Sequence, residues 1–250
     1  MALPKLNTPT YELEVPSTDD KIKYRPFLVK EEKILLMAME SKDNAQIIQA
    51  VKDIVKSCTF DKVDVSSMPM FDMEYIFLNI RARSVGEVSK LKILCPDDKK
   101  TYADVDLDLT EVSVQVGDDH TNKIELTDDM GVIMTYPTID SFLESGIEQI
   151  NANNMLDVIG SCILQIYENN GEKVYQGKDQ TKKEIEEFIE SMNSAQFKKV
   201  QSFFDTMPKL SHKIKVKNPK TKKVSEVTLS GLNDFSHSPF TQYPRELLRN

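Results

Sequence analysis

The residues best suited to nucleophilic or metal chemistry in this sequence are three cysteines and three histidines. No histidine lies in an H-E-x-x-H or similar ligand spacing, so the sequence predicts no catalytic metal site. A thiol and an imidazole can still meet in space, which leaves an enzyme with a Cys–His pair as one alternative. Apolar flanks around Cys58 and Cys162 favour buried, inert thiols instead. The six residues are Cys58, Cys95, Cys162, His120, His212 and His237.

Two further patterns could bind phosphate or supply carboxylates, and both have a simpler structural explanation. Gly171 and Gly177 are separated by five residues where a P-loop has four, and Asp179 stands where its Ser or Thr would hold magnesium. A polar turn explains this segment better. Three aspartates alternate with apolar residues, which predicts the solvated face of a strand: Asp104, Asp106 and Asp108. We therefore expect no cofactor.

The charge balance restricts the class of partner. A net charge of −8 over 250 residues disfavours non-specific electrostatic binding to nucleic acid or to an anionic membrane. The sequence has no run of about 18 apolar residues and no signal-peptide layout, and its three separated cysteines do not suggest a disulfide framework. It thus predicts a cytoplasmic protein with reduced thiols. One basic strip keeps a nucleic-acid-binding module open as an alternative: Lys213, Lys215, Lys217, Lys220, Lys222 and Lys223.

Helices must position most of the chain. Ile47, Val51 and Ile54 form a helical stripe, next to an apolar patch at 34–39 and a possible interruption at 41–44. Pro69 suits the first turn of a second helix, and Thr181 with Glu184 suits a capping box. Short hairpins cannot cover these apolar stripes, so we expect the helices to form one core. The predicted helices are 30–55, 70–83, 141–167 and 181–207.

Alternating patterns predict short strands between the helices. Turn-rich segments at 16–20, 95–100 and 218–221 each separate two such strands, and more strands are expected over 112–136. The fold class is therefore α+β, a helical core with small antiparallel, ribbon-like hairpins inserted mid-chain and near the C-terminus. We expect an N-terminal hairpin plus helices at 1–86, a small β subdomain at 87–136, more of the helical core at 137–210, a C-terminal hairpin at 211–235 and a tail at 236–250.

Three stretches resemble a known family. They are KYRPFLVKEEK at 23–33, KIEL at 123–126 followed by MTYP at 134–137, and LSGLNDF at 229–235. In order and spacing they are similar to the baseplate hub assembly proteins of T4-like contractile-tailed bacteriophages. The resemblance implies a hub subunit or a hub assembly catalyst, and the sequence does not separate the two.

The resemblance also gives the hairpin turns a meaning. In relatives, such a turn can carry Cys-Pro-x-Cys, whose two thiolates bind zinc together with a second pair. Here Asp98 replaces the second cysteine after Cys95, and the other turn reads Asn-Pro-Lys-Thr at 218–221. One thiolate cannot hold structural zinc. We therefore expect turns without metal, held by packing and by side-chain hydrogen bonds from Asp97, Asp98 and Asn218.

The implied function is non-enzymatic binding of other baseplate hub or tape-measure proteins, with no nucleic acid or membrane partner. Such a protein is expected to expose apolar surface that a partner covers. It would act in the host cytoplasm during assembly, with the tail baseplate of the virion as a further location. We expect residues 213–250 to dock on an acidic partner, with lysines steering the encounter and tail aromatics supplying buried area. The candidate partner-binding residues are Tyr102, Lys215, Lys217, Phe240 and Tyr243.

Overall fold

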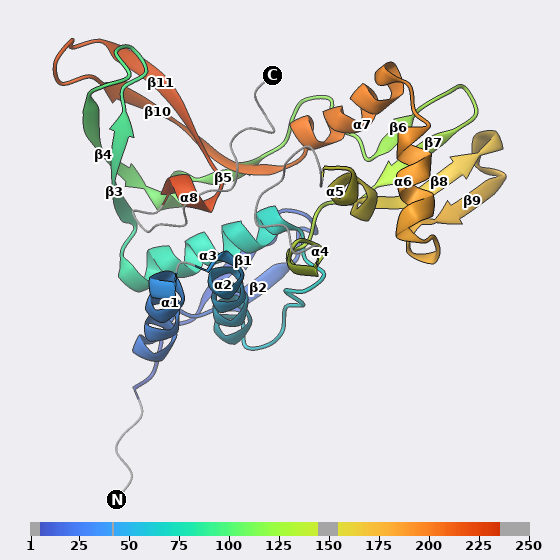
Figure 1. Ribbon diagram of the computed structural model, residues 1–250. Coiled ribbons are helices and arrows are strands. Elements are labelled where there is room, and N and C mark those ends of the chain that lie inside the picture. Colours follow the sequence, from blue (N-terminus) through green and yellow to red (C-terminus); the bar gives the residue numbers. More distant parts are fainter. Residues whose placement is uncertain (1–5, 42, 145–154, 236–250) are drawn as a thin grey trace, which may run out of the picture. The chain divides into compact units, whose positions relative to one another are not determined.

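The structure is a computed structural model that describes residues 6–41, 43–144 and 155–235 (Figure 1). It confirms the predicted α+β class, because helices accompany small antiparallel sheets of two to four strands. The described chain divides into two compact units. Unit 1 contains residues 6–115 and 209–235, and unit 2 contains residues 116–208.

Unit 1 begins with a hairpin and three helices. Asp43 separates the first two helices, because its carboxylate accepts hydrogen bonds from the backbone N–H groups of Ala45 and Gln46 and so caps the second helix. The predicted helix over 30–55 is thus two helices, with the break at the interruption seen in the sequence. The elements are β1 (Tyr11–Glu14), β2 (Lys21–Tyr24), α1 (Val29–Ser41), α2 (Asn44–Cys58) and α3 (Met70–Val85).

Helix α3 is the central helix of unit 1. Pro69 immediately precedes it, at the boundary that the sequence predicted, and Gly86 follows its last residue at a φ of 138°. Most of its apolar side chains are buried. The predicted stripe of α2 is buried as well. The buried residues of these two helices include Ile47, Val51, Ile54, Phe71, Ile76, Phe77, Leu78 and Ile80.

Two long hairpins complete unit 1. In the first, Lys92 faces Asp104 and Lys90 faces Asp106 across the strands, and these residues lie on its exposed face, as the alternation predicted. In Figure 1 the two hairpins lie side by side on the left, with their turns together. The elements are β3 (Val88–Leu94), β4 (Tyr102–Asp108), η1 (Leu109–Glu111), β5 (Ser113–Gln115), β10 (Lys209–Lys217), β11 (Val224–Ser230) and α8 (Leu232–Phe235); β5 pairs with β10.

Unit 2 is a four-stranded antiparallel sheet with helices on one face. The strand order is β6-β7-β8-β9, and α5, α6 and α7 contribute apolar side chains to the core on that face. Phe203 and Val200 of α7 are almost fully buried there. The elements are β6 (Lys123–Glu125), β7 (Gly131–Met134), α4 (Ile139–Glu144), α5 (Met155–Ser161), β8 (Ile163–Glu168), η2 (Asn169–Gly171), β9 (Lys173–Gln176), η3 (Gly177–Asp179), α6 (Lys182–Glu190) and α7 (Ser194–Thr206).

Two predicted helices of this region need correction. The single helix over 141–167 is wrong, because residues 163–168 form β8, paired with β7 and β9. A short apolar run is compatible with either element, and the strand pairing decided it. The helix over 181–207 is two helices. Thr181 and Glu184 form the predicted capping box of α6, and Asn193 with Gln196 forms a second one that begins α7.

The two units also divide the predicted segments differently. The boundary after Gln115 falls inside the segment 87–136 that the sequence pattern assigned to one β subdomain, so β3 to β5 lie in unit 1 and β6 and β7 lie in unit 2. The helices expected to form one core are likewise distributed over both units. The effect of a substitution on stability therefore has to be measured for each unit separately.

Candidate protein-interaction surfaces

The turns of the two long hairpins have the same backbone conformation. In the first, the Lys99 N–H donates to the carbonyl of Cys95 at 3.0 Å, and in the second the Lys222 N–H donates to the carbonyl of Asn218 at 2.9 Å. Lys99 and Lys222 both adopt a positive φ, of 52° and 64°. The segment 218–223 therefore repeats the turn of 95–100 with different side chains.

Hydrogen bonds join these turns across a long distance in sequence. The Asp97 carboxylate accepts from Asn218 Nδ2 at 2.9 Å and from Thr221 Oγ1 at 2.5 Å. These two bonds hold the pKa of Asp97 below its usual range. Asp98 accepts from the hydroxyl and N–H of Thr101, which hold its pKa well below its usual range. The predicted role of Asp97, Asp98 and Asn218 in the turns is thus confirmed.

The positions where a zinc-binding pair of turns would carry ligands hold Cys95, Asp98, Asn218 and Thr221. Within residues 6–41, 43–144 and 155–235, no group of three His, Cys, Asp or Glu side chains could hold a metal ion. The amide of Asn218 instead connects the turns: its Nδ2 donates to Asp97 and its Oδ1 accepts from the N–H groups of Lys220 and Thr221. Hydrogen bonds link the hairpin tips here.

We expect Asn218→Ala to lower the free energy of unfolding by about 1–3 kcal/mol, because Asn218 is buried and the substitution leaves its partners unpaired. Urea denaturation measures the loss, and hydrogen exchange should rise at the amides of Lys220 and Thr221. Thr228→Ala, at an exposed position of β11, is the matched control with little expected effect. Equal stability of the two variants would contradict a structural role of the linked turns.

The structure separates the candidate partner-binding residues that it describes. Lys215 and Lys217 lie on the exposed face of β10, opposite Glu226 and Val224 of β11. Tyr102 is 61% exposed and lies on the other hairpin, opposite Leu94. The lysines and the tyrosine thus belong to different hairpins. Phe240 and Tyr243 lie outside the described residues.

Helix α1 exposes apolar residues that the sequence pattern predicted to be buried. We expected the apolar patch at 34–39 to be core, but in α1 the apolar residues on the solvent side are 47–80% exposed. Only Glu31 and Ala38 of this helix are buried. Consecutive apolar residues point to several sides of a helix, and the sequence does not show which of these sides a neighbour covers. The exposed apolar residues of α1 are Val29, Ile34, Leu36 and Met37.

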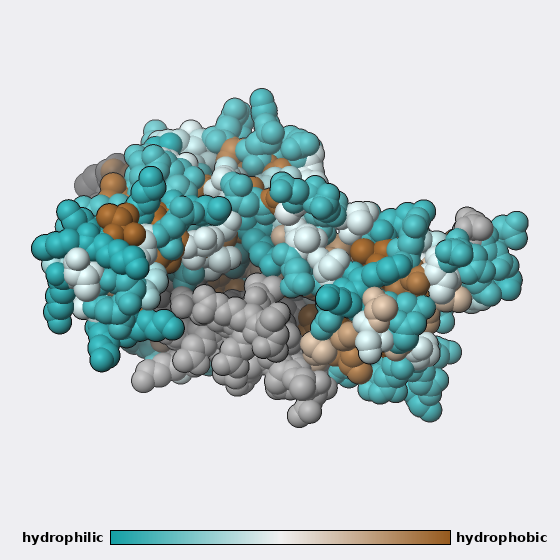
Figure 2. Space-filling model, turned by 90° about the horizontal axis from the view of Figure 1, so that it is seen from above, coloured by the Kyte–Doolittle hydropathy of each residue, from teal (hydrophilic) through white to brown (hydrophobic). Residues whose placement is uncertain are grey.

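Other large apolar side chains, such as Val85, Val88 and Val116, are 56–64% exposed, but α1 carries four exposed ones between positions 29 and 37. Figure 2 shows one face of the molecule, on which hydrophilic side chains dominate and apolar ones gather in small patches. Scattered apolar side chains need no explanation, whereas four on one short helix make a candidate interaction surface. We call Val29, Ile34, Leu36 and Met37 the α1 surface.

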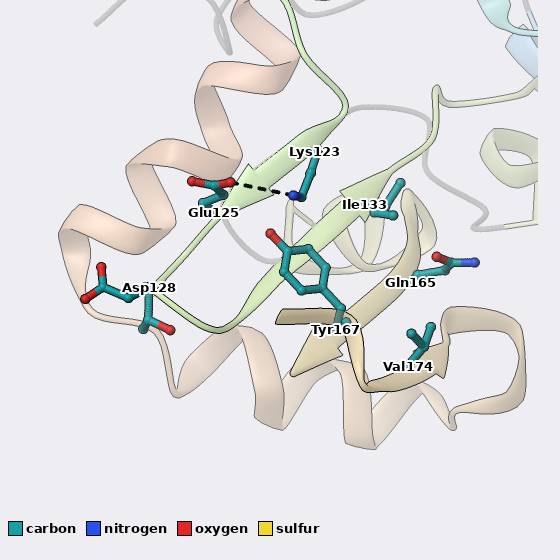
Figure 3. A pocket seen from close by; sticks show the side chains of 9 residues that line it. Lys123, Glu125, Asp128, Ile133, Gln165, Tyr167 and Val174 are labelled. Atoms are coloured by element: carbon teal, nitrogen blue, oxygen red, sulfur yellow. Dashed lines mark ion pairs between the residues drawn. The ribbon is translucent and has the colours of Figure 1, made fainter. Parts of the chain in front are cut away.

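Unit 2 has a hollow of about 380 Å³ on the sheet face opposite its helices (Figure 3). Two rows of side chains cross all four strands at this face. The rows are Lys123, Ile133, Gln165 and Gln176, and Glu125, Gly131, Tyr167 and Val174. Figure 3 shows the Tyr167 ring in the middle of this face, below the ion pair of Lys123 and Glu125.

Tyr167 is nine-tenths buried, yet its hydroxyl has no hydrogen-bond partner within the described part of the chain. The ring reaches over Gly131, where a Cβ would lie 2.2 Å from the tyrosine hydroxyl. Only glycine fits beneath it. Lys123 Nζ lies 5.3 Å from the ring centroid, a cation–π contact. A buried hydroxyl without a partner is costly.

The described thiols and imidazoles do not form a catalytic pair. Burial raises the pKa of Cys58 to about 11 and that of Cys162 to about 12, so both are protonated at neutral pH. His120 is held between Thr206 Oγ1 and the Tyr136 hydroxyl, each at 3.0 Å. Its contacts are structural. His212 lies on β10, 3.9 Å from Glu111, and His237 lies outside the described residues.

The sequence matches the family described as T4 bacteriophage base plate protein over residues 8–236. The chain belongs to this family. No curated protein and no solved structure matches it. The match covers both units, so both belong to the region that the base plate family shares.

Membership in the T4 base plate family supports a structural or assembly role in the phage tail baseplate. It also implies contact with other baseplate proteins, for which the α1 surface and the exposed face of β10 are the candidate regions. Across the described ranges, no helix has the length and apolar character needed to cross a membrane. The family match does not separate a hub subunit from an assembly factor.

Proposed function

We propose that this base plate protein is a non-enzymatic component or assembly factor of the baseplate hub that binds other hub or tape-measure proteins. It would act in the host cytoplasm during assembly and, as a hub component, in the tail of the virion. The family match supports the baseplate role, and the α1 surface supports the mode of action.

The observation that carries this proposal is the exposure of the α1 surface. Leu36 and Met37 are 53% and 60% exposed, although Leu and Met favour the interior of a monomer. Burying such side chains against a partner gives roughly 1.5–3 kcal/mol each. A helix that is anchored to its own unit on one side and carries apolar residues among charged ones on its exposed side can contact a partner.

The basic hairpin supports a second contact in this role. Lys213, Lys215 and Lys217 are all exposed on one face of β10, in a chain with a net charge of −8. We propose that the segment 213–250 docks on an acidic partner, as the sequence suggested. Exposed lysines mainly accelerate encounter, and apolar anchors such as Tyr102, Phe240 and Tyr243 would slow dissociation.

Complementation tests the proposal. Leu36→Ser/Met37→Ser, supplied from a plasmid to a phage whose own copy carries a stop codon, is expected to reduce particle yield at least about tenfold, because two anchors of about 2 kcal/mol each are lost. Its unfolding should be unchanged, since both side chains already face solvent. Val116→Ser/Leu164→Ser, at positions 56% and 48% exposed, is the matched control.

A normal particle yield with the Leu36→Ser/Met37→Ser variant would show that the α1 surface is not a docking surface. If the control lowers the yield equally, loss of apolar surface in general explains the effect, and the proposal fails. Mass spectrometry of purified particles then separates the two roles. A hub subunit is present in mature particles, and an assembly factor is absent from them.

A further inference from the structure

One side of α1 packs against its own unit. Helix α1 lies beside α2, and Ala38 forms a buried cluster with Ile47 and Ala50 of that helix (Figure 1). Glu31, seven positions before Ala38 and therefore on the same side of the helix, is buried as well. Residues about half a turn away from these two face solvent, and their order along the helix determines what can bind there.

The solvent side of α1 carries charged and apolar residues in a fixed order. With 3.6 residues per turn, positions 33, 36, 37 and 40 share one side of a helix. The two middle residues, Leu36 and Met37, are 53% and 60% exposed. Lys33 and Glu40 are exposed too, and neither makes an ion pair with any other described residue. From start to end this side thus presents a cation, two apolar side chains and an anion.

This order is complementary to itself when one copy of the helix is reversed. In two antiparallel α1 helices related by a two-fold axis between positions 36 and 37, Leu36 of each copy faces Met37 of the other. Lys33 and Glu40 both lie about 5 Å along the helix from that axis. The lysine of each copy therefore faces the glutamate of the other. Each half of the contact contains one apolar pair and one pair of opposite charges.

We propose that the α1 surface binds the α1 surface of a second copy of the chain, as an antiparallel pair of helices. This inference rests on the docking role proposed for the α1 surface and names the partner that covers it. An unrelated partner has to supply the opposite pattern of charge, whereas a second copy supplies it by symmetry. Because the contact uses the same residues of both copies, it closes at a dimer.

The size of α1 predicts a weak dimer. Its 13 residues form a helix about 20 Å long. One face of such a helix covers less than the roughly 1,200–2,000 Å² of a stable complex. Sedimentation velocity of the full chain over a concentration series should therefore show a dimer that dissociates on dilution. Leu36→Ser/Met37→Ser should stay monomeric throughout, because four apolar side chains are lost from the contact.

Charge reversal tests the antiparallel arrangement. Lys33→Glu places two glutamates opposite each other in both halves of the contact, and Glu40→Lys places two lysines there. Each variant alone should raise the dissociation constant about tenfold or more. An equal mixture of the two variants has opposite charges in both halves, so association should return. Lys33→Glu/Glu40→Lys in one chain exchanges the charges and should associate like the unmodified chain.

Control variants match these changes in charge. Lys178→Glu and Glu190→Lys alter exposed residues of unit 2 and should associate like the unmodified chain. Helix α1 should persist in all variants, since an acidic residue near its start and a basic one near its end agree with the helix dipole. Urea denaturation checks this. At about 500 mM salt, the charge variants should approach the behaviour of the unmodified chain.

A chain that is monomeric at every concentration overturns the proposal, as does a mixture of Lys33→Glu and Glu40→Lys that associates no better than either variant alone. If the chain is monomeric while Leu36→Ser/Met37→Ser still lowers the particle yield, the α1 surface binds a different protein and only this inference fails. If the chain dimerises as expected while that variant gives a normal yield, the proposed function fails instead.

Discussion

Replacing Arg25 with Met is expected to lower the free energy of unfolding of unit 1 by about 3–5 kcal/mol. Arg25 donates to the Glu31 carboxylate at 2.9 Å and to the Ser57 hydroxyl at 3.0 Å. The Glu31 side chain is only 4% exposed and also accepts from the Leu28 N–H at 2.6 Å. The hydrogen bonds of Arg25 and Glu31 connect the start of α1 with the end of α2. Without Arg25, the buried carboxylate keeps only the largely exposed Lys30, whose Nζ lies 3.4 Å away, as a cationic partner.

Glu31 also makes this stability depend on pH. Burial alone raises its pKa, but hydrogen bonds from Arg25 and from the Leu28 N–H outweigh burial and lower the pKa from 4.5 to about 2. A group with a lowered folded pKa stabilises above its unfolded value. Its contribution is complete above about pH 4.5 and is lost as the pH falls toward 2. Arg25→Met should remove most of this acid dependence.

Urea denaturation at neutral pH and at acid pH measures both effects. Lys23→Met, which removes an ion pair with Glu12 that is about two-thirds exposed, is the matched control and should change little. The double variant Arg25→Met/Glu31→Leu should recover part of the loss, because no charge is then left unpaired. If Arg25→Met and Lys23→Met are equally stable, the buried pair does not support unit 1.

Phe203→Ala should lower the free energy of unfolding of unit 2 by about 3–5 kcal/mol. Phe203 is 1% exposed, and its ring lies 5.6 Å from that of Tyr136 and 5.2 Å from that of Phe204. The substitution leaves a cavity at the centre of the helix-covered face of the sheet. It also removes the ring against which His120 packs at 5.2 Å.

Hydrogen exchange resolved by segment is the appropriate measurement, since the loss should be local. Protection should fall in β7, β8 and α7 and remain in α3, which belongs to unit 1. Phe204→Ala, at a half-buried position beside Phe203, should cost less. An equal loss of protection in both units would mean that they unfold as one, contrary to the division by contacts.

Local signals in the sequence were sufficient for the boundaries that a proline or a predicted capping box marks. Pro69 and the Thr181 capping box act within one helical turn, so the helices that they begin were predictable. The strands with alternating patterns were found for the same reason. The exception is β8, whose apolar residues were correctly expected in the core but on a helix. Only the hydrogen bonds from β7 and β9 decide between the two.

The candidate surfaces required more than local signals. The sequence assigned the turn role of Asp97 and Asn218, but their contact joins residues that are 121 positions apart. It identified the lysines of β10, whose alternation places them on one face. It did not reveal the α1 surface, because periodicity shows that a helix is apolar and not which neighbours cover it. The sequence also did not predict the burial of the Tyr167 hydroxyl, because the residues around it come from three different strands.

By itself the sequence determined the α+β class, the starts of α3 and α6, the basic strip and the resemblance to a phage baseplate family, because propensity, capping and charge act over a few residues or as simple sums. The tertiary structure alone decided the division into two units, the strand identity of residues 163–168, the linked hairpin tips and the exposure of α1. Each of these depends on which distant segments bury surface or share hydrogen bonds, and that competition is settled only in the folded chain.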